Sequence, residues 1–255
     1  MKLGRLDLCI NAKNFQSTYS FYTKLGFKFE EGDLQEGWCV LSHSNLRLGL
    51  FTNVFDGIML NFRGGNVKRI TEELKLKGVI FKQDFKPGKD GGGSASIPDP
   101  DDYQVFFDTA PSELELLNKK FTSSTVFSVR DDKIIYGRCD ICLKVANLQN
   151  SYEFYSALGF KLVEGSIEEE WLVLEVSNLR LVLSKGETHD LIIKFRGSDI
   201  EEIFNLLTAE GFKFSSPFTL EVDGSQGASL SDPEGNLIYF NTHSITTQST
   251  EENQI

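Results

Sequence analysis

The chain has 255 residues, of which 40% are hydrophobic and 25% charged, a composition typical of a folded protein with one or two domains. The net charge of −11 disfavours a nucleic-acid-binding protein, which normally carries a basic surface, and favours cationic or metal-bearing ligands. No apolar run is long enough to span a bilayer and the N-terminal segment lacks a signal-peptide core, so we expect a cytoplasmic protein.

The same unit is written twice along the chain, at a constant shift of 133 residues. Trp38 superposes on Trp171, "SNLRL" at 44–48 recurs at 177–181, and "DPDDYQVFFDT" superposes on "DPEGNLIYFNT" without a gap. An internal repeat of this length predicts two homologous domains. We place them at 1–112 and 134–243, joined by a linker at 113–133 with a short helix, and followed by a flexible tail at 244–255.

Within each unit, strand and helix patterns alternate in a fixed order. In the second unit, Asn147 and Gly159 delimit a helix, as do Asp199 and Gly211. Alternating or apolar segments predict the strands, which are 140–146, 160–165, 170–176, 179–184, 190–197, 212–218, 227–232 and 236–242. We therefore predict an α+β protein with four βαβββ modules, two in each domain.

These residues resemble a known group of proteins. The opening pattern of an Asp strand followed by "N-L-x-x-S-x-x-FY-x-x-LGF", the mid-unit strand and helix, and the closing "DP-[DE]-G-N-x-I" strand are similar to the vicinal oxygen chelate superfamily. Its members include glyoxalase I, bleomycin-resistance proteins and extradiol dioxygenases. The resemblance implies that each pair of modules curls into a half-open barrel, with helices outside and a cup inside.

Strand alternation predicts which side chains enter the cups. In the second unit Ile141, Leu143, Ile193 and Phe195 are expected under the helices. The predicted ligand-binding residues are Asp7, Trp38, Arg47, Met59 and Phe106 in the first cup and Asp140, Trp171, Arg180, Asp190, Lys194 and Tyr239 in the second.

The resemblance also defines where a metal would bind. In metal-using relatives the ligands come from the starts of the first and fifth strands and from the last strand. These positions hold Asp7, Gly57 and Phe106 in the first unit and Asp140, Asp190 and Tyr239 in the second. The first set has one ligand group, and neutral tyrosine is a poor ligand, so no cofactor is favoured. Asp140, Asp190 and Tyr239 are the candidates if a divalent metal binds in the second domain.

The four cysteines predict buried thiols in a reducing compartment. Cys139 and Cys142 form a C-x-x-C pattern within a strand, where residues three apart point to opposite faces, so a shared zinc ion is not expected.

Three functional hypotheses follow. The first is metal-independent binding of a small amphipathic molecule, partly aromatic or cationic, in the manner of a bleomycin-resistance protein. The second is a metal-dependent enzyme of glyoxalase or dioxygenase type, with its site in the second domain. In the third, one repeat serves as a structural partner that replaces a dimer interface. The expected partners are a small-molecule ligand and, at most, a second copy of the chain; neither nucleic acid nor a membrane is expected.

Overall fold

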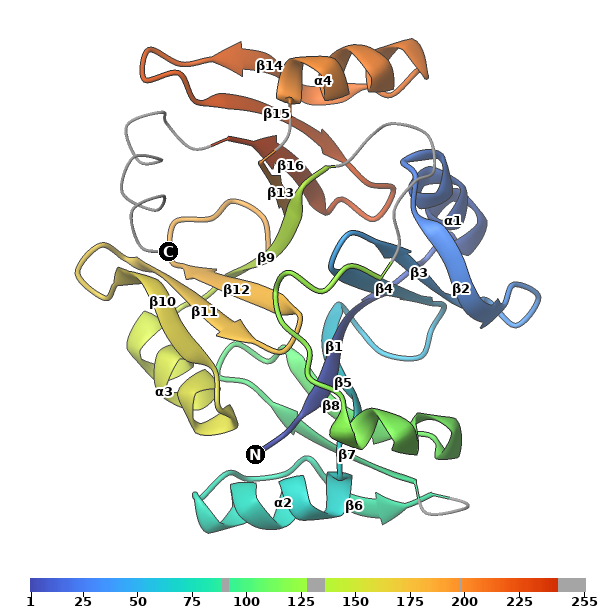
Figure 1. Ribbon diagram of the computed structural model, residues 1–255, viewed down its shortest axis with the longest axis vertical. Helices are drawn as coiled ribbons and strands as arrows, with labels where there is room; N and C mark the ends of the chain where they lie inside the picture. Colours follow the sequence, from blue (N-terminus) through green and yellow to red (C-terminus); the bar gives the residue numbers. More distant parts are fainter. Residues whose placement is uncertain (89–91, 128–135, 198, 243–255) are drawn as a thin grey trace.

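The computed structural model describes residues 1–88, 92–127, 136–197 and 199–242, which form two eight-stranded sheets, four α-helices and a 3₁₀ helix (Figure 1). The first half contains β1 (Gly4–Asn11), α1 (Phe15–Lys24), β2 (Lys28–Asp33), β3 (Trp38–His43), β4 (Leu46–Phe51), β5 (Ile58–Gly64), α2 (Val67–Leu76), β6 (Gln83–Pro87), β7 (Gly93–Pro98), β8 (Gln104–Thr109) and the 3₁₀ helix η2 (Pro111–Asn118). The second half contains β9 (Arg138–Lys144), α3 (Leu148–Leu158), β10 (Lys161–Ser166), β11 (Trp171–Val176), β12 (Leu179–Ser184), β13 (Leu191–Arg196), α4 (Ile200–Ala209), β14 (Phe214–Leu220), β15 (Gln226–Ser231) and β16 (Leu237–Asn241). The predicted α+β class and the tandem βαβββ modules are confirmed.

The two sheets have the same strand order. The first runs β2-β3-β4-β1-β5-β8-β7-β6 and the second β10-β11-β12-β9-β13-β16-β15-β14. In each, the first strands of two modules pair antiparallel at the centre, as β1 with β5 and β9 with β13. Each of these strands also pairs in parallel with the last strand of its own module. The central four strands of a sheet therefore bring the start and the end of both modules together.

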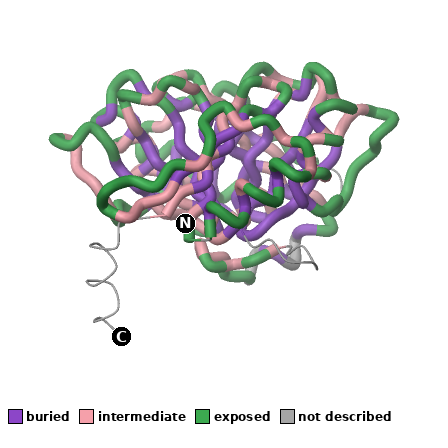
Figure 2. The backbone as a smooth tube through the Cα atoms, turned by 90° about the horizontal axis from the view of Figure 1, so that it is seen from above, coloured by how far each residue is buried: buried purple, intermediate pink, exposed green. Residues whose placement is uncertain are grey.

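Each sheet has one face in the main core and one inner face. Ile141, Leu143, Ile193 and Phe195 lie in the main hydrophobic core together with their first-half counterparts. The intervening residues of the second sheet form a separate buried cluster of Cys142, Val173, Val182 and Ile192, with Leu237 and Tyr239 against it. The predicted alternation is therefore confirmed. Figure 2 shows the buried strands at the centre of the molecule and exposed segments around its rim.

Side-chain caps fix the helix starts. The side chains of Asn14, Asn66, Asn147 and Asp199 each accept a hydrogen bond from the backbone three residues later. Helix α3 ends at Gly159, whose φ of 99° is accessible to glycine without strain. In the described part of the chain, no helix has the length and apolar character needed to cross a bilayer.

Two asparagines join the halves. Asn178, in the β11–β12 turn, accepts a hydrogen bond from the Leu6 amide (2.8 Å) and donates to the Leu6 carbonyl (2.9 Å). Asn45, its counterpart in the β3–β4 turn, makes the same two bonds to Cys139 at 2.7 and 2.9 Å. Both side chains also donate to the other's backbone carbonyl. Each turn thus binds the backbone of the first strand of the opposite repeat.

A second reciprocal contact joins each closing turn to the first helix of the other repeat. Tyr22 of α1 donates to Asp232 (2.8 Å), and Tyr155 of α3 donates to Asp99 (2.7 Å). Figure 1 shows α1 beside the β15–β16 turn, which carries Asp232. The aromatic and the "DP" motifs that repeat along the sequence therefore meet across the domain interface.

Replacing Asn178 by alanine is expected to lower the free energy of unfolding by about 3 kcal/mol, because buried backbone groups of Leu6 and Asn45 lose their partners. Urea denaturation followed by circular dichroism measures this loss. Asn205→Ala, on the exposed side of α4, is the matched control and should change stability little. An equal effect of the two substitutions would contradict the role of Asn178 in joining the halves.

Asp99 should contribute a pH-dependent term to stability. Burial raises the pKa of its carboxyl from 3.8 to about 6, despite hydrogen bonds from Tyr155 and the backbone. The folded protein therefore binds the proton more tightly than the unfolded chain, so this contribution falls as pH rises from 3.8 to 6. The free energy of unfolding of wild type relative to Asp99→Asn should drop by up to about 3 kcal/mol over that range. Urea titrations at pH 4, 5, 6 and 7 test this, and a constant difference would contradict it.

Candidate ligand-binding site

The inner face of each sheet, here called a cup, is built from aligned rows of side chains. In the first cup, Asp7 lies opposite Asn61, which in turn lies opposite Phe106, and Cys9 lies opposite Met59. In the second cup, Asp140 lies opposite Lys194, which lies opposite Tyr239. An apolar row runs beside it, formed by Val173, Val182, Cys142, Ile192 and Leu237.

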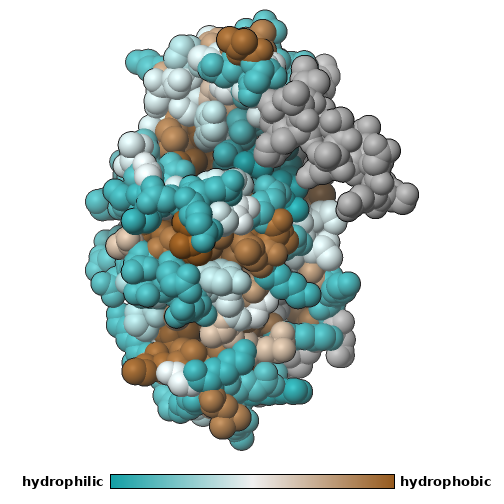
Figure 3. Space-filling model, turned by 90° about the vertical axis from the view of Figure 1, so that its left-hand side faces the viewer, coloured by the Kyte–Doolittle hydropathy of each residue, from teal (hydrophilic) through white to brown (hydrophobic). Residues whose placement is uncertain are grey.

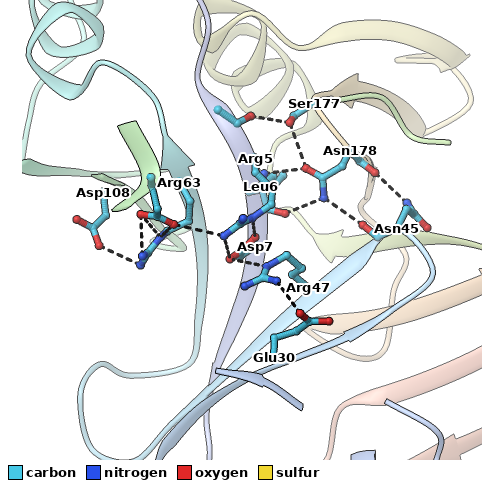
Figure 4. Close-up of polar contacts among 12 residues, drawn as sticks. Arg5, Leu6, Asp7, Glu30, Asn45, Arg47, Arg63, Asp108, Ser177 and Asn178 are labelled. Carbon is cyan, nitrogen blue, oxygen red and sulfur yellow. Dashed lines mark hydrogen bonds and ion pairs between the residues drawn. The ribbon is translucent and has the colours of Figure 1, made fainter. Parts of the chain in front are cut away.

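Ion pairs occupy the first cup (Figure 4). Asp7 is only 4% exposed and contacts Arg5 at 2.9 Å and Arg47 at 3.4 Å. Arg47 also contacts Glu31 at 3.0 Å. Arg63 contacts Asp108 at 3.0 Å, and burial raises the pKa of the Asp108 carboxyl against the effect of that guanidinium. The charged groups of this cup therefore satisfy one another.

The segment after the first sheet supplies a further carboxylate to this cup. Glu113, from the 3₁₀ helix η2, contacts Arg63 at 2.8 Å and Arg5 at 3.4 Å. Further along, Phe127 lies over the Arg47 guanidinium, with 6.0 Å between Cζ and the ring centroid. Residues predicted as part of the linker thus pack against the first cup and contact two of its arginines through one buried carboxylate.

The remaining predicted residues of the first cup take apolar positions. Met59 is 7% exposed, and Trp38 is half-buried with its ring stacked on Phe51 at 6.2 Å between centroids. Phe106 lies across from Ser96 and Asn61. These side chains lie in the predicted cup, but the polar centre between them is filled by ion pairs.

The second cup has the same arginine frame and a different centre. Arg138 and Arg196 contact Asp140 at 3.1 and 3.5 Å, and Asp140 is 1% exposed. Arg180 contacts Glu164 at 2.7 Å, as Arg47 contacts Glu31 in the first cup. Lys194 lies between Asp140 and Tyr239 in the register, with its Nζ 5.5 Å from the centroid of the Tyr239 ring.

Two residues predicted for this cup lie at its edge. Trp171 is the first residue of β11 and is 36% exposed, pairing with Ser166 and Ser184. Asp190 precedes β13 and is exposed, and its carbonyl accepts a hydrogen bond from the Lys144 amide. Figure 3 shows the side of the molecule that carries β10, where apolar surface interrupts a hydrophilic one; the exposed apolar residues of β10 are Leu162 and Val163.

The candidate metal ligands of the second domain do not come together. Asp190 lies four residues before Lys194 and just outside β13, away from the row that holds Asp140 and Tyr239. Asp140 is held by two guanidinium groups, and the residue opposite it is a lysine. In the described part of the chain, no three His, Cys, Asp or Glu side chains are grouped to hold a metal ion. A divalent cation would therefore meet one carboxylate among three cationic side chains, and this donor set does not fit a metal.

The C-x-x-C cysteines point to opposite faces, as predicted. Cys139 lies in the main core, and Cys142 lies in the cup cluster. Burial raises the pKa of the Cys142 thiol to about 12, so it is protonated at neutral pH and acts as an apolar contact.

Sequence reasoning missed four charged residues of the cups, Arg5, Arg138, Arg63 and Arg196, together with Glu113. The sequence held a signal for the arginines, because "GRLD" and "GRCD" recur at the 133-residue shift, as does "FRG". Alternation places Arg5 and Arg138 on the same face as Asp7 and Asp140. No comparable pattern marks Glu113, which reaches its cup from outside the sheet.

No protein-family model matches this chain, and no curated protein matches it. Solved structures do. A catechol 2,3-dioxygenase superposes with a TM-score of 0.63 and 14% identity, covering 96% of this chain and 89% of the dioxygenase. The Mn(II)-bound glyoxalase from Novosphingobium aromaticivorans gives 0.63 and 12%, covering 94% and 81%. A 2,3-dioxygenase from Pseudomonas sp. KL28 gives 0.61 and 15%, covering 94% and 91%. The predicted resemblance is confirmed at the level of fold: this chain has the vicinal oxygen chelate fold, with two domains in tandem.

Proposed function

We propose that the protein binds a small amphipathic molecule in the second cup, without a metal ion. The observation that carries this proposal is the apolar cluster of Cys142, Val173, Val182 and Ile192, which is separate from the main core and lies beside a polar row. A ligand with one apolar and one polar end would match this pairing of an apolar row with a polar row. The first cup has its polar centre filled by Glu113 and acts as the structural partner.

The alternative function is that of a metal-dependent enzyme of dioxygenase or glyoxalase type. The solved structures with this fold favour it, since they include dioxygenases and a Mn(II)-bound glyoxalase. The donor set around Asp140 favours metal-independent binding instead, because Arg138, Arg196 and Lys194 surround that carboxylate. At such low sequence identity, the similarity to these structures shows a shared fold and not a shared chemistry.

Added bulk in the apolar row should weaken binding. Ile192→Phe adds bulk at the centre of that row, and we expect it to weaken binding of the neutral fluorescent probe N-phenyl-1-naphthylamine by at least about tenfold. The same change at the equivalent position of the first cup, Met59→Phe, should leave the affinity unchanged. Fluorescence titration measures both, and circular dichroism checks that each variant folds. If Met59→Phe removes binding and Ile192→Phe does not, the site has been assigned to the wrong cup.

Elemental analysis of freshly purified protein decides between the two functions. We expect less than one equivalent of metal per chain and no rise in melting temperature on addition of Mn²⁺, Fe²⁺ or Zn²⁺. An ion that bound the folded protein would raise its melting temperature by mass action. One equivalent of metal per chain, lost in the Asp140→Asn variant, would overturn metal-independent binding and favour the enzyme.

A further inference from the structure

The two cups share arginines and differ in the groups that neutralise them. The 133-residue shift superposes Arg5, Arg47 and Arg63 on Arg138, Arg180 and Arg196. Two neighbouring positions of the sheet change: Asn61 becomes Lys194, and Asp108 becomes Asn241. Each of the two replacements adds one positive charge, so these positions of the second cup are more positive than those of the first by two charges.

Lys194 forms no ion pair with a described residue. Its Nζ has no carboxylate within 4 Å among the described residues and lies over the ring of Tyr239. Asp140, directly across the sheet, is taken by Arg138 and Arg196 instead. Burial lowers the pKa of Lys194, which means that its charged form is partly deprived of water. An anion placed beside this ammonium would recover part of that loss.

The first cup shows what such an anion looks like in this frame. The Glu113 carboxylate lies between Arg63 and Arg5, with one oxygen 2.8 Å from Arg63 and the other 3.4 Å from Arg5. Glu113 is held there by the chain itself, since its carboxylate also accepts a hydrogen bond from the Ala110 amide at 3.0 Å. Arg138 and Arg196 occupy the corresponding strand positions in the second cup and face each other in the register, as Arg5 and Arg63 do.

We propose that the ligand of the second cup is an amphipathic carboxylate. Its carboxylate group lies against Lys194 and the pair Arg138 and Arg196, where Glu113 lies in the first cup. Its apolar part lies on the row formed by Val173, Val182, Cys142, Ile192 and Leu237. This inference rests on the proposed function and adds that the ligand carries a negative charge. The sequence alone suggests a cationic ligand, because the whole chain has a net negative charge. The arginines and Lys194 of the second cup favour an anionic ligand instead.

Matched pairs of acids and amides test the sign of the charge. Benzoate and benzamide, and 3-phenylpropionate and 3-phenylpropanamide, compete with N-phenyl-1-naphthylamine bound to the full-length protein. We expect each acid to displace the probe at a concentration at least about tenfold lower than its amide, as one charge-assisted contact provides. Lys194→Met keeps the length of the side chain and should reduce this ratio to near one. Lys213→Met, which removes an exposed lysine of the same domain, should leave the ratio unchanged.

The possible results separate the inference from the function on which it rests. Equal displacement by acids and amides, with the neutral probe still bound and still sensitive to Ile192→Phe, overturns the carboxylate and leaves binding in the second cup intact. If the acids still displace the probe at lower concentration than the amides in the Lys194→Met variant, the assignment of the carboxylate to this site is also overturned. Tighter binding of phenyl phosphate than of either acid would overturn the assignment to a carboxylate. If the neutral probe does not bind at all, the proposed function itself fails.

Discussion

A guanidinium group removed from water must face an anion, and this requirement shapes both inner faces of the protein. The repeat places three arginines on each cup, and a folded chain has few ways to neutralise them. In the first cup Asp7, Asp108, Glu31 and Glu113 do so, at distances of 2.8 to 3.4 Å. The second cup keeps the arginines, but Asn241 stands where the first cup has the Asp108 carboxylate, and Lys194 adds a further positive charge. The difference in function that we propose between the cups follows from this difference in charge.

The interface between the halves explains why the cups can differ without loss of the fold. Outside the shared hydrophobic core, the side-chain hydrogen bonds of Asn45, Asn178, Tyr22 and Tyr155 join the repeats, and these residues lie in turns and helices. None of these side chains belongs to an inner face. Substitutions inside one cup therefore leave the main core and the interface in place, which is how a fold accommodates new sites on an old scaffold.

Much of the fold could be predicted because its information is local. Alternation along a strand assigned Ile141 and Cys142 to opposite faces, and a shift of 133 residues assigned the same topology to both halves. The site could be predicted less well, because it depends on register and on contacts between distant residues. Alternation placed Asp190 on the same face as Lys194 but could not show that it lies at the edge of the cup. The contact of Glu113 with Arg63 joins residues from different elements, and the local sequence of neither segment predicts it.

The reciprocal contacts at the interface have a consequence for how the two halves have diverged. A chain with one repeat would need a second copy to supply the partner of its Asn turn and of its closing turn. In such a symmetric dimer every substitution appears twice, so a carboxylate that fills one cup fills both. Joining the repeats in a single chain removes that coupling. The residues after β8 can then supply a carboxylate to one cup, and the sequence that follows the second repeat is free to differ.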